Sequence, residues 1–209
     1  AFYWIGQAYE KEGEVLYRKA QVYYRMGEGE KARLCLQDLL KDRESLYRTR
    51  LLAAYNACYL LNKERAALKM AKSVLKETKT GSEEYFRAGF LMAEIYMRNG
   101  KQAKAKKIAE GLLSVWQSRY GDDSLKKWKY RRKRLYELGL LHLFAGRSQE
   151  ALEQVHFMME APKCEGICCG QQGGTCAEAL HLLALICECT GKRQEALDYY
   201  TKLIQSGFL

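Results

Sequence analysis

Proline is almost absent from this chain, with a single residue, Pro162, among 209. An interior proline removes a backbone hydrogen bond and clashes with the preceding turn, so long proline-free stretches favour helices. The sequence also lacks any run of about 18 apolar residues, the length that a membrane-spanning helix requires. We therefore expect a helical chain without a membrane span. Its hydrophobic content of 48% is sufficient for a large buried core.

Sequence motifs of enzymes are also missing. There is no phosphate-binding loop, no dinucleotide-binding fingerprint and no HExxH sequence. Only three histidines occur, His142, His156 and His181, and none has a nucleophile and a carboxylate in a spacing that suggests catalysis. We predict a protein that is not an enzyme and that uses no cofactor.

A short motif is present five times: glycine or asparagine, followed five positions later by alanine. The pairs are Gly27/Ala32, Asn62/Ala67, Gly100/Ala105, Gly146/Ala151 and Gly191/Ala196. Apolar segments with helical spacing flank each pair, which is typical of helical repeats. Each repeat is expected to consist of a helix A, a turn at the glycine or asparagine, and a helix B. The turn requires a left-handed residue, for which asparagine is the best substitute for glycine.

This register predicts the helices and the domain organisation. We expect helices at 2–12, 14–26, 29–41, 44–61, 63–78, 82–98, 101–119, 123–145, 148–160, 175–190 and 192–206. They form one domain, 1–209, with repeats at 14–43, 44–80, 82–120, 122–160 and 175–209, a partial leading unit at 1–13 and a loop at 161–174. The chain begins within an apolar helical segment, so we expect the natural N-terminus to lie before Ala1.

Helix A of four repeats has a small residue seven positions before the turn: Ala20, Ala93, Gly139 and Ala184, with Tyr55 as the exception. Ala93, Tyr96, Gly100 and Ala105 show the full pattern, which resembles the tetratricopeptide repeat family over nearly the whole chain. The closing proline of that family is missing, and the repeats exceed its usual length of about 34 residues. The resemblance implies an all-α, right-handed solenoid of about five helix pairs. It also implies binding of a protein or peptide in a concave groove lined by the A helices.

The resemblance places one stripe of each A helix in this groove. The candidate partner-binding residues are Tyr17, Gln21, Tyr24, Asn56, Tyr59, Arg87, Phe90, Glu94, Lys129, Lys133 and Tyr136. Aromatic side chains offer contact area at low entropic cost, and an asparagine amide can bond both backbone groups of an extended peptide. The alternative is that these are ordinary half-buried positions of a solenoid. We favour partner binding.

Positive charge is concentrated in the middle of the chain. The net charge is +10, and seven of the nine residues from Lys126 to Arg134 are basic. Such a run suits an acidic partner segment, a solvated helix face or, least of the three, nucleic acid, because no nucleic-acid-binding fold accompanies it. Besides a protein-binding scaffold, two alternatives stay open: a peptide-sensing module attached to an output domain, and a nucleic-acid-associated protein that uses 126–134. The sequence does not indicate the oligomeric state.

Four of the eight cysteines lie in one glycine-rich segment: Cys164, Cys168, Cys169 and Cys176. Zinc sites usually take paired cysteines with a regular spacer, and this spacing is irregular. We favour free thiols over a metal site or disulfides, and we predict no metal. The other cysteines lie in helical segments, which favours a reducing, cytoplasmic compartment over secretion.

Overall fold

The computed structural model describes residues 2–41, 46–125, 128–160 and 177–205, and it describes side-chain environments at 13–41, 46–121, 133–159 and 177–205. These residues form ten α-helices and no strand, so the predicted all-α class is confirmed. None of these helices is both long enough and apolar enough to cross a membrane. The chain divides into two compact units, Ala1–Asn99 and Gly100–Leu209, each described by itself.

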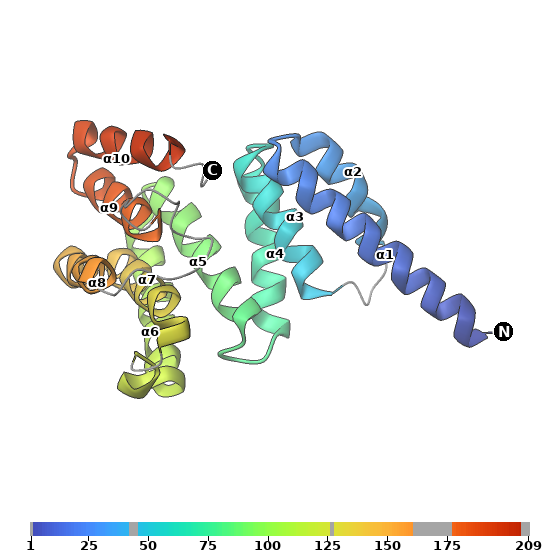
Figure 1. The fold of residues 1–209 in the computed structure, drawn as a ribbon, viewed down its shortest axis with the longest axis horizontal. Coiled ribbons are helices and arrows are strands. Elements are labelled where there is room, and N and C mark those ends of the chain that lie inside the picture. Colours follow the sequence, from blue (N-terminus) through green and yellow to red (C-terminus); the bar gives the residue numbers. More distant parts are fainter. Residues whose placement is uncertain (1, 42–45, 126–127, 161–176, 206–209) are drawn as a thin grey trace. The chain divides into compact units, whose positions relative to one another are not determined.

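Unit 1 contains five helices: α1 (Phe2–Arg25), α2 (Gly29–Leu39), α3 (Tyr47–Tyr59), α4 (Glu64–Glu77) and α5 (Glu83–Arg98) (Figure 1). Each helix packs against the next one along the chain. The A helices α1, α3 and α5 also contact one another in succession. The B helices α2 and α4 have no such contact with each other within the described residues, although both pack against α3.

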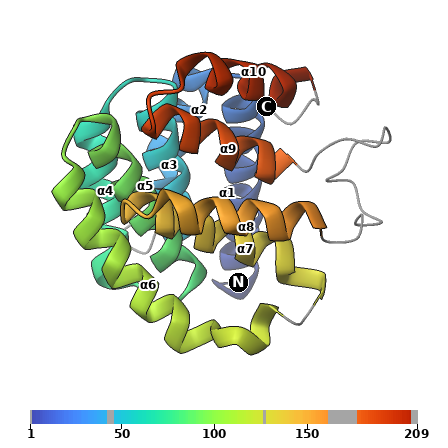
Figure 2. The ribbon, with the colours of Figure 1, turned by 90° about the vertical axis from the view of Figure 1, so that its left-hand side faces the viewer.

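Unit 2 contains α6 (Gln102–Leu125), α7 (Trp128–Phe144), α8 (Ser148–Glu160), α9 (Ala177–Cys189) and α10 (Arg193–Gln205) (Figure 2). The pairs α7–α8 and α9–α10 repeat the helix A–helix B arrangement, and the A helices α7 and α9 contact each other. Helix α6 is interrupted at Gly121, whose φ of 44° is not helical.

The predicted turns are confirmed at all five motif positions. Gly27, Gly100, Gly146 and Gly191 have positive φ, and Asn62, with a φ of 51°, is the one such residue that is not glycine among those described. A backbone hydrogen bond that closes the helix end accompanies the turn, as from Arg147 N–H to the carbonyl of His142 at 2.8 Å. Asn62 therefore has the left-handed conformation that this turn requires.

Small residues bring the helices together, as the repeat pattern predicts. The motif alanines Ala32, Ala67, Ala105 and Ala151 are fully buried, and Ala196 is nearly so. At Gly139 of α7, an added Cβ would collide with Leu182 Cδ2 of α9. The missing side chain at Gly139 thus permits the close packing of two successive A helices.

The predicted helix boundary at residues 12–14 is wrong. The structure has one helix, α1, where we expected helices at 2–12 and 14–26, because Gly13 continues it. A glycine inside a helix costs only about 1 kcal/mol relative to alanine, which the packing of α1 against α2 can offset. The expected end at residue 119 lies next to the break at Gly121 in α6.

Candidate functional site

Side chains from three A helices meet in unit 1. Tyr24 comes from α1, Tyr55 and Tyr59 from α3, and Glu94 from α5; we call these four residues the tyrosine cluster. The Tyr59 hydroxyl donates a hydrogen bond to Glu94 Oε2 at 2.5 Å. The rings of Tyr55 and Tyr59 stack with centroids 6.0 Å apart. The cluster therefore connects α3 to α5 through direct side-chain contacts.

The phenols of the cluster keep their protons. Burial, followed by the charges of Cys58 and Glu94, raises the pKa of Tyr24 to about 12. Burial also raises the pKa of Tyr55, and burial together with the Glu94 carboxylate raises that of Tyr59. All three hydroxyls are consequently neutral at physiological pH, and those of Tyr55 and Tyr59 donate hydrogen bonds to Arg87 and Glu94 within unit 1.

Helical spacing explains why α3 presents this pair of tyrosines. Tyr55 and Tyr59 are four residues apart, so they lie on one face of the helix. Ala53, Ala54 and Ala57 lie on its other faces and are buried. The Tyr55 hydroxyl also donates to the backbone carbonyl of Arg87 on α5, at 3.3 Å.

Arginine side chains lie over neighbouring tyrosine rings. The Arg98 guanidinium lies 5.9 Å from the ring centroid of Tyr59, and the Arg48 guanidinium 4.6 Å from that of Tyr17. The Gln21 amide donates to the Tyr17 hydroxyl at 3.4 Å. The face that carries the tyrosine cluster thus combines aromatic surface with cationic and amide groups.

Two further residues predicted for the groove lie on α5. Arg87 is exposed and forms an ion pair with Glu83 at 2.9 Å. Phe90 is half-buried and stacks on the buried ring of Phe86, with centroids 6.3 Å apart. Phe90 therefore contacts the core of unit 1 as well as contributing to its surface.

The prediction that Asn56 offers its amide to a partner is wrong. Only 1% of Asn56 is exposed, and its Nδ2 donates to the carbonyl of Gly29 at 2.9 Å. Gly29 begins α2 and leaves no room for a side chain, because an added Cβ would lie 2.7 Å from Leu60 Cβ. The amide thus joins α3 to the start of α2 and has a structural role.

Sequence reasoning missed Tyr55. It occupies the position that holds a small residue in the other four repeats. This departure from the repeat pattern was the sequence feature that could have identified Tyr55 as a contact residue. A large side chain cannot fit where two A helices pack closely, so the tyrosine points its hydroxyl at the next A helix instead. Because the repeat pattern assigns this position to helix packing, the pattern did not identify Tyr55 as a candidate contact residue.

Unit 2 has a smaller polar cluster between its A helices. The Tyr136 hydroxyl lies 2.7 Å from His181 Nδ1, joining α7 to α9. Burial lowers the pKa of His181, so the neutral ring is favoured at pH 7. Tyr200 of α10 is adjacent, with its ring 6.5 Å from that of His181 and its hydroxyl donating to Glu188 at 3.0 Å.

The basic run is described only at its end. The side chain of Lys129 and those from 126 to 132 lie outside the described residues. Lys133 Nζ lies 4.0 Å from the Glu137 carboxylate, and Arg134 pairs with the same carboxylate at 2.6 Å. The Arg134 guanidinium also lies 3.6 Å from the ring centroid of Tyr120.

The cysteine segment, with Cys164, Cys168, Cys169 and Cys176, lies outside the described residues. The described cysteines, Cys35, Cys58, Cys187 and Cys189, are free thiols. Within the same part of the chain, no group of His, Cys, Asp or Glu side chains has the arrangement of a metal site. The state of the cysteine segment stays a prediction.

Comparison with known proteins supports the repeat assignment. Residues 14–43 match the family model of the tetratricopeptide repeat. The structure is similar to the crystal structure of the nearly identical TPR-like repeats of a putative kinesin light chain from Podosopora anserina, with a TM-score of 0.54, 16% identity and coverage of 93% of this chain and 94% of that chain. A single-substitution variant of those repeats gives a TM-score of 0.50 at 17% identity, over 94% and 93% of the two chains.

These likenesses concern the fold alone, because the identities are low. No curated protein matches the sequence. The predicted resemblance to the tetratricopeptide repeat family and the helical-repeat fold are confirmed.

Proposed function

Given this tetratricopeptide-like repeat fold, we propose that the chain is a non-catalytic scaffold that binds a segment of another protein on the A-helix face of unit 1. Tetratricopeptide repeats generally mediate protein–protein interactions. The observation that carries the proposal is the tyrosine cluster, in which three A helices contribute contact groups to one place. Large aromatic side chains at such a position are typical of binding surfaces.

The contact residues follow from the predicted stripe, with Asn56 removed and Tyr55 added. In unit 1 they are Tyr17, Gln21, Tyr24, Tyr55, Tyr59, Arg87, Phe90 and Glu94. The predicted stripe residues of unit 2, Lys129, Lys133 and Tyr136, stay a separate prediction. Arg98 lies over Tyr59 and adds positive charge beside the cluster, which supports a partner that offers carboxylates, whereas Arg48, over Tyr17, is paired with Glu14. An acidic partner and a cytoplasmic location are parts of the proposal.

Selection from a random peptide library tests the proposal. Peptides selected on the full chain should bind the Tyr55→Ala and Tyr59→Ala variants at least about tenfold more weakly, since each loses a buried aromatic contact. Tyr47→Ala is a matched control, because Tyr47 is 38% exposed and Tyr59 37%, and Tyr47 bonds Glu77 instead of the cluster. The proposal would be contradicted if the Tyr55→Ala and Tyr59→Ala variants bound the peptides as tightly as the wild type does, or if Tyr47→Ala weakened binding equally.

A further inference from the structure

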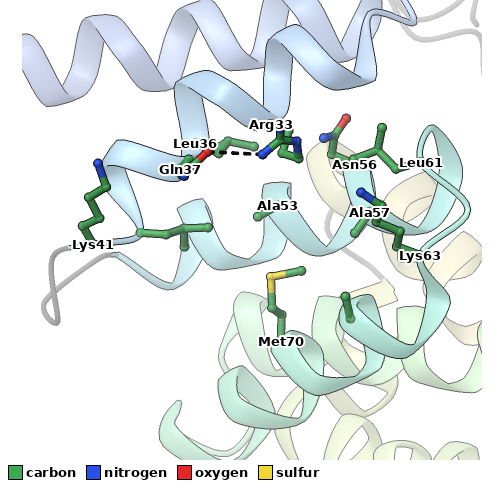
Figure 3. Close-up of a pocket in the computed structure, with 12 residues that line it drawn as sticks. Arg33, Leu36, Gln37, Lys41, Ala53, Asn56, Ala57, Leu61, Lys63 and Met70 are labelled. Atoms are coloured by element: carbon green, nitrogen blue, oxygen red, sulfur yellow. Dashed lines mark hydrogen bonds between the residues drawn. The ribbon is translucent and has the colours of Figure 1, made fainter.

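A pocket lies on the other side of α3 from the tyrosine cluster. It has a volume of about 290 Å³ and is lined by α2, α3, α4 and the turn before α4 (Figure 3). Ala53 and Ala57 of α3 form its floor, with Leu36 of α2 and Met70 of α4 on either side (Figure 3). On the α-helical period these alanines lie on the opposite side from Tyr55 and Tyr59. The pocket is therefore a separate surface from the proposed A-helix site.

The arrangement of the helices explains the opening. The B helices α2 and α4 each pack against α3 but make no contact with each other within the described residues. The alanines on the floor are too small to fill the space between them. An apolar space of this size, at the lower end for ligand pockets, suits large side chains of a docked segment better than a bulky small molecule.

The rim of the pocket is cationic. Arg33 of α2, Lys41 just after α2 and Lys63 just before α4 line it, and no aspartate or glutamate does. Arg33 pairs with Glu30 and Lys41 with Asp38, whereas Lys63 forms no ion pair within the described part of the chain and only attracts Glu30 from a longer distance. Helix α4 adds further exposed cations next to the pocket, among them Lys69. The surface therefore favours apolar groups flanked by negative charge.

We propose that this pocket is a docking site for an amphipathic helix of a partner protein whose apolar face is bordered by aspartate and glutamate. A helical repeat has no open strand edge to pair with a peptide backbone, so side chains must carry the recognition. A helix achieves this by inserting residues spaced at i, i+3, i+4 and i+7 into a groove between two helices. The interaction is independent of the A-helix site.

A designed peptide provides the probe. A fluorescein-labelled amphipathic helix, with leucines at i, i+3, i+4 and i+7 and otherwise glutamate and alanine, is titrated into the full chain and followed by fluorescence anisotropy. The peptide should bind, and a version with lysine in place of each glutamate should bind at least about tenfold more weakly. Absence of binding, or equal binding of the two peptides, would overturn the proposal.

Two pairs of substitutions in the chain identify where the peptide binds. Ala66 lines the pocket and is exposed, so Ala66→Phe obstructs the pocket without filling the core, and it should weaken binding at least about tenfold. Ala103→Phe is the matched control at an exposed alanine of α6 and should leave binding unchanged. Lys63→Glu should weaken binding more than Lys72→Glu, which reverses a charge of α4 that does not line the pocket.

The outcomes separate this inference from the proposed function. If Tyr59→Ala weakens the probe and Ala66→Phe does not, the peptide binds the A-helix face and the pocket inference is wrong. If Ala66→Phe instead abolishes self-association of the chain in sedimentation experiments, the occupant is a second copy, and the proposed partner is likewise wrong.

Discussion

At the scale of single residues, Asn56 is the position where sequence pattern and physical environment diverge most. The repeat register places it on the binding stripe, but a hydrogen bond to Gly29 determines its orientation. That bond depends on a close approach of α2 and α3, which no local pattern encodes. Tyr24 and Tyr59 also belong to the predicted stripe, and both are part of the tyrosine cluster. Their side chains are long enough to reach the region where the three A helices come together.

Replacing Asn56 by alanine should lower the free energy of unfolding by about 1–3 kcal/mol, because the buried carbonyl of Gly29 loses its donor. Urea denaturation followed by circular dichroism measures this loss. Gln37→Ala is the control at an exposed residue and should stay within about 0.5 kcal/mol of the wild type. If the Asn56→Ala variant is as stable as the wild type, the hydrogen bond from the Asn56 side chain to Gly29 contributes nothing to stability.

The Tyr24 phenol should lose its proton at a higher pH than an ordinary tyrosine. Its folded pKa is about 12, against about 10 for a tyrosine in an unfolded chain. The folded state therefore holds this proton more tightly. Its contribution to stability is complete below pH 10 and is lost as the pH rises through about 12.

The difference in absorbance at 295 nm between the wild type and Tyr24→Phe isolates this group. The difference should appear near pH 12 in the folded protein and near pH 10 in denaturant. A folded-state difference that is already complete at pH 10 would show that Tyr24 is solvated.

At the scale of elements, the sequence predicted the number and order of helices well. The left-handed turn residues and the buried alanines are local features, and they positioned most helix ends within a few residues. The failure at Gly13 has a physical cause. Glycine alone does not end a helix, and tertiary packing decides whether the helix continues.

Two glycines offer a matched test of helix packing. Gly29→Ala should destabilise the protein by about 1–3 kcal/mol, because the new Cβ would lie 2.7 Å from Leu60 Cβ and force α2 away from α3. Gly111→Ala, inside α6 and with open space around it, should stabilise by about 0.5–1 kcal/mol. Thermal denaturation of both variants checks the signs, and the same sign for both would contradict the packing argument.

At the scale of the whole molecule, burial differs between the two helix types. The A helices α3, α5 and α9 each have seven buried residues, whereas α4 has three and α10 two. Helices α3 and α9 each pack against a B helix on both sides and against another A helix, and α5 packs against α4 and α3. The A helices should consequently open less often than the B helices.

Amide hydrogen exchange monitored by mass spectrometry tests this difference. Peptides from α3, α5 and α9 should exchange more slowly than those from α4 and α10, because opening an A helix exposes more apolar surface. Comparable rates in α3 and α4 would contradict the expectation and would mean that each pair opens as one unit.

The two kinds of connection have different lengths. The turns from helix A to helix B are uniformly short, as between Tyr59 and Glu64 or between Cys189 and Arg193. The connections from helix B to the next helix A vary, from the gap between Leu125 and Trp128 to that between Glu160 and Ala177. Inserted sequence is therefore accommodated at one kind of joint only. An epitope tag spliced between Lys79 and Thr80 should leave a foldable protein, whereas the same tag after Asn62 should not.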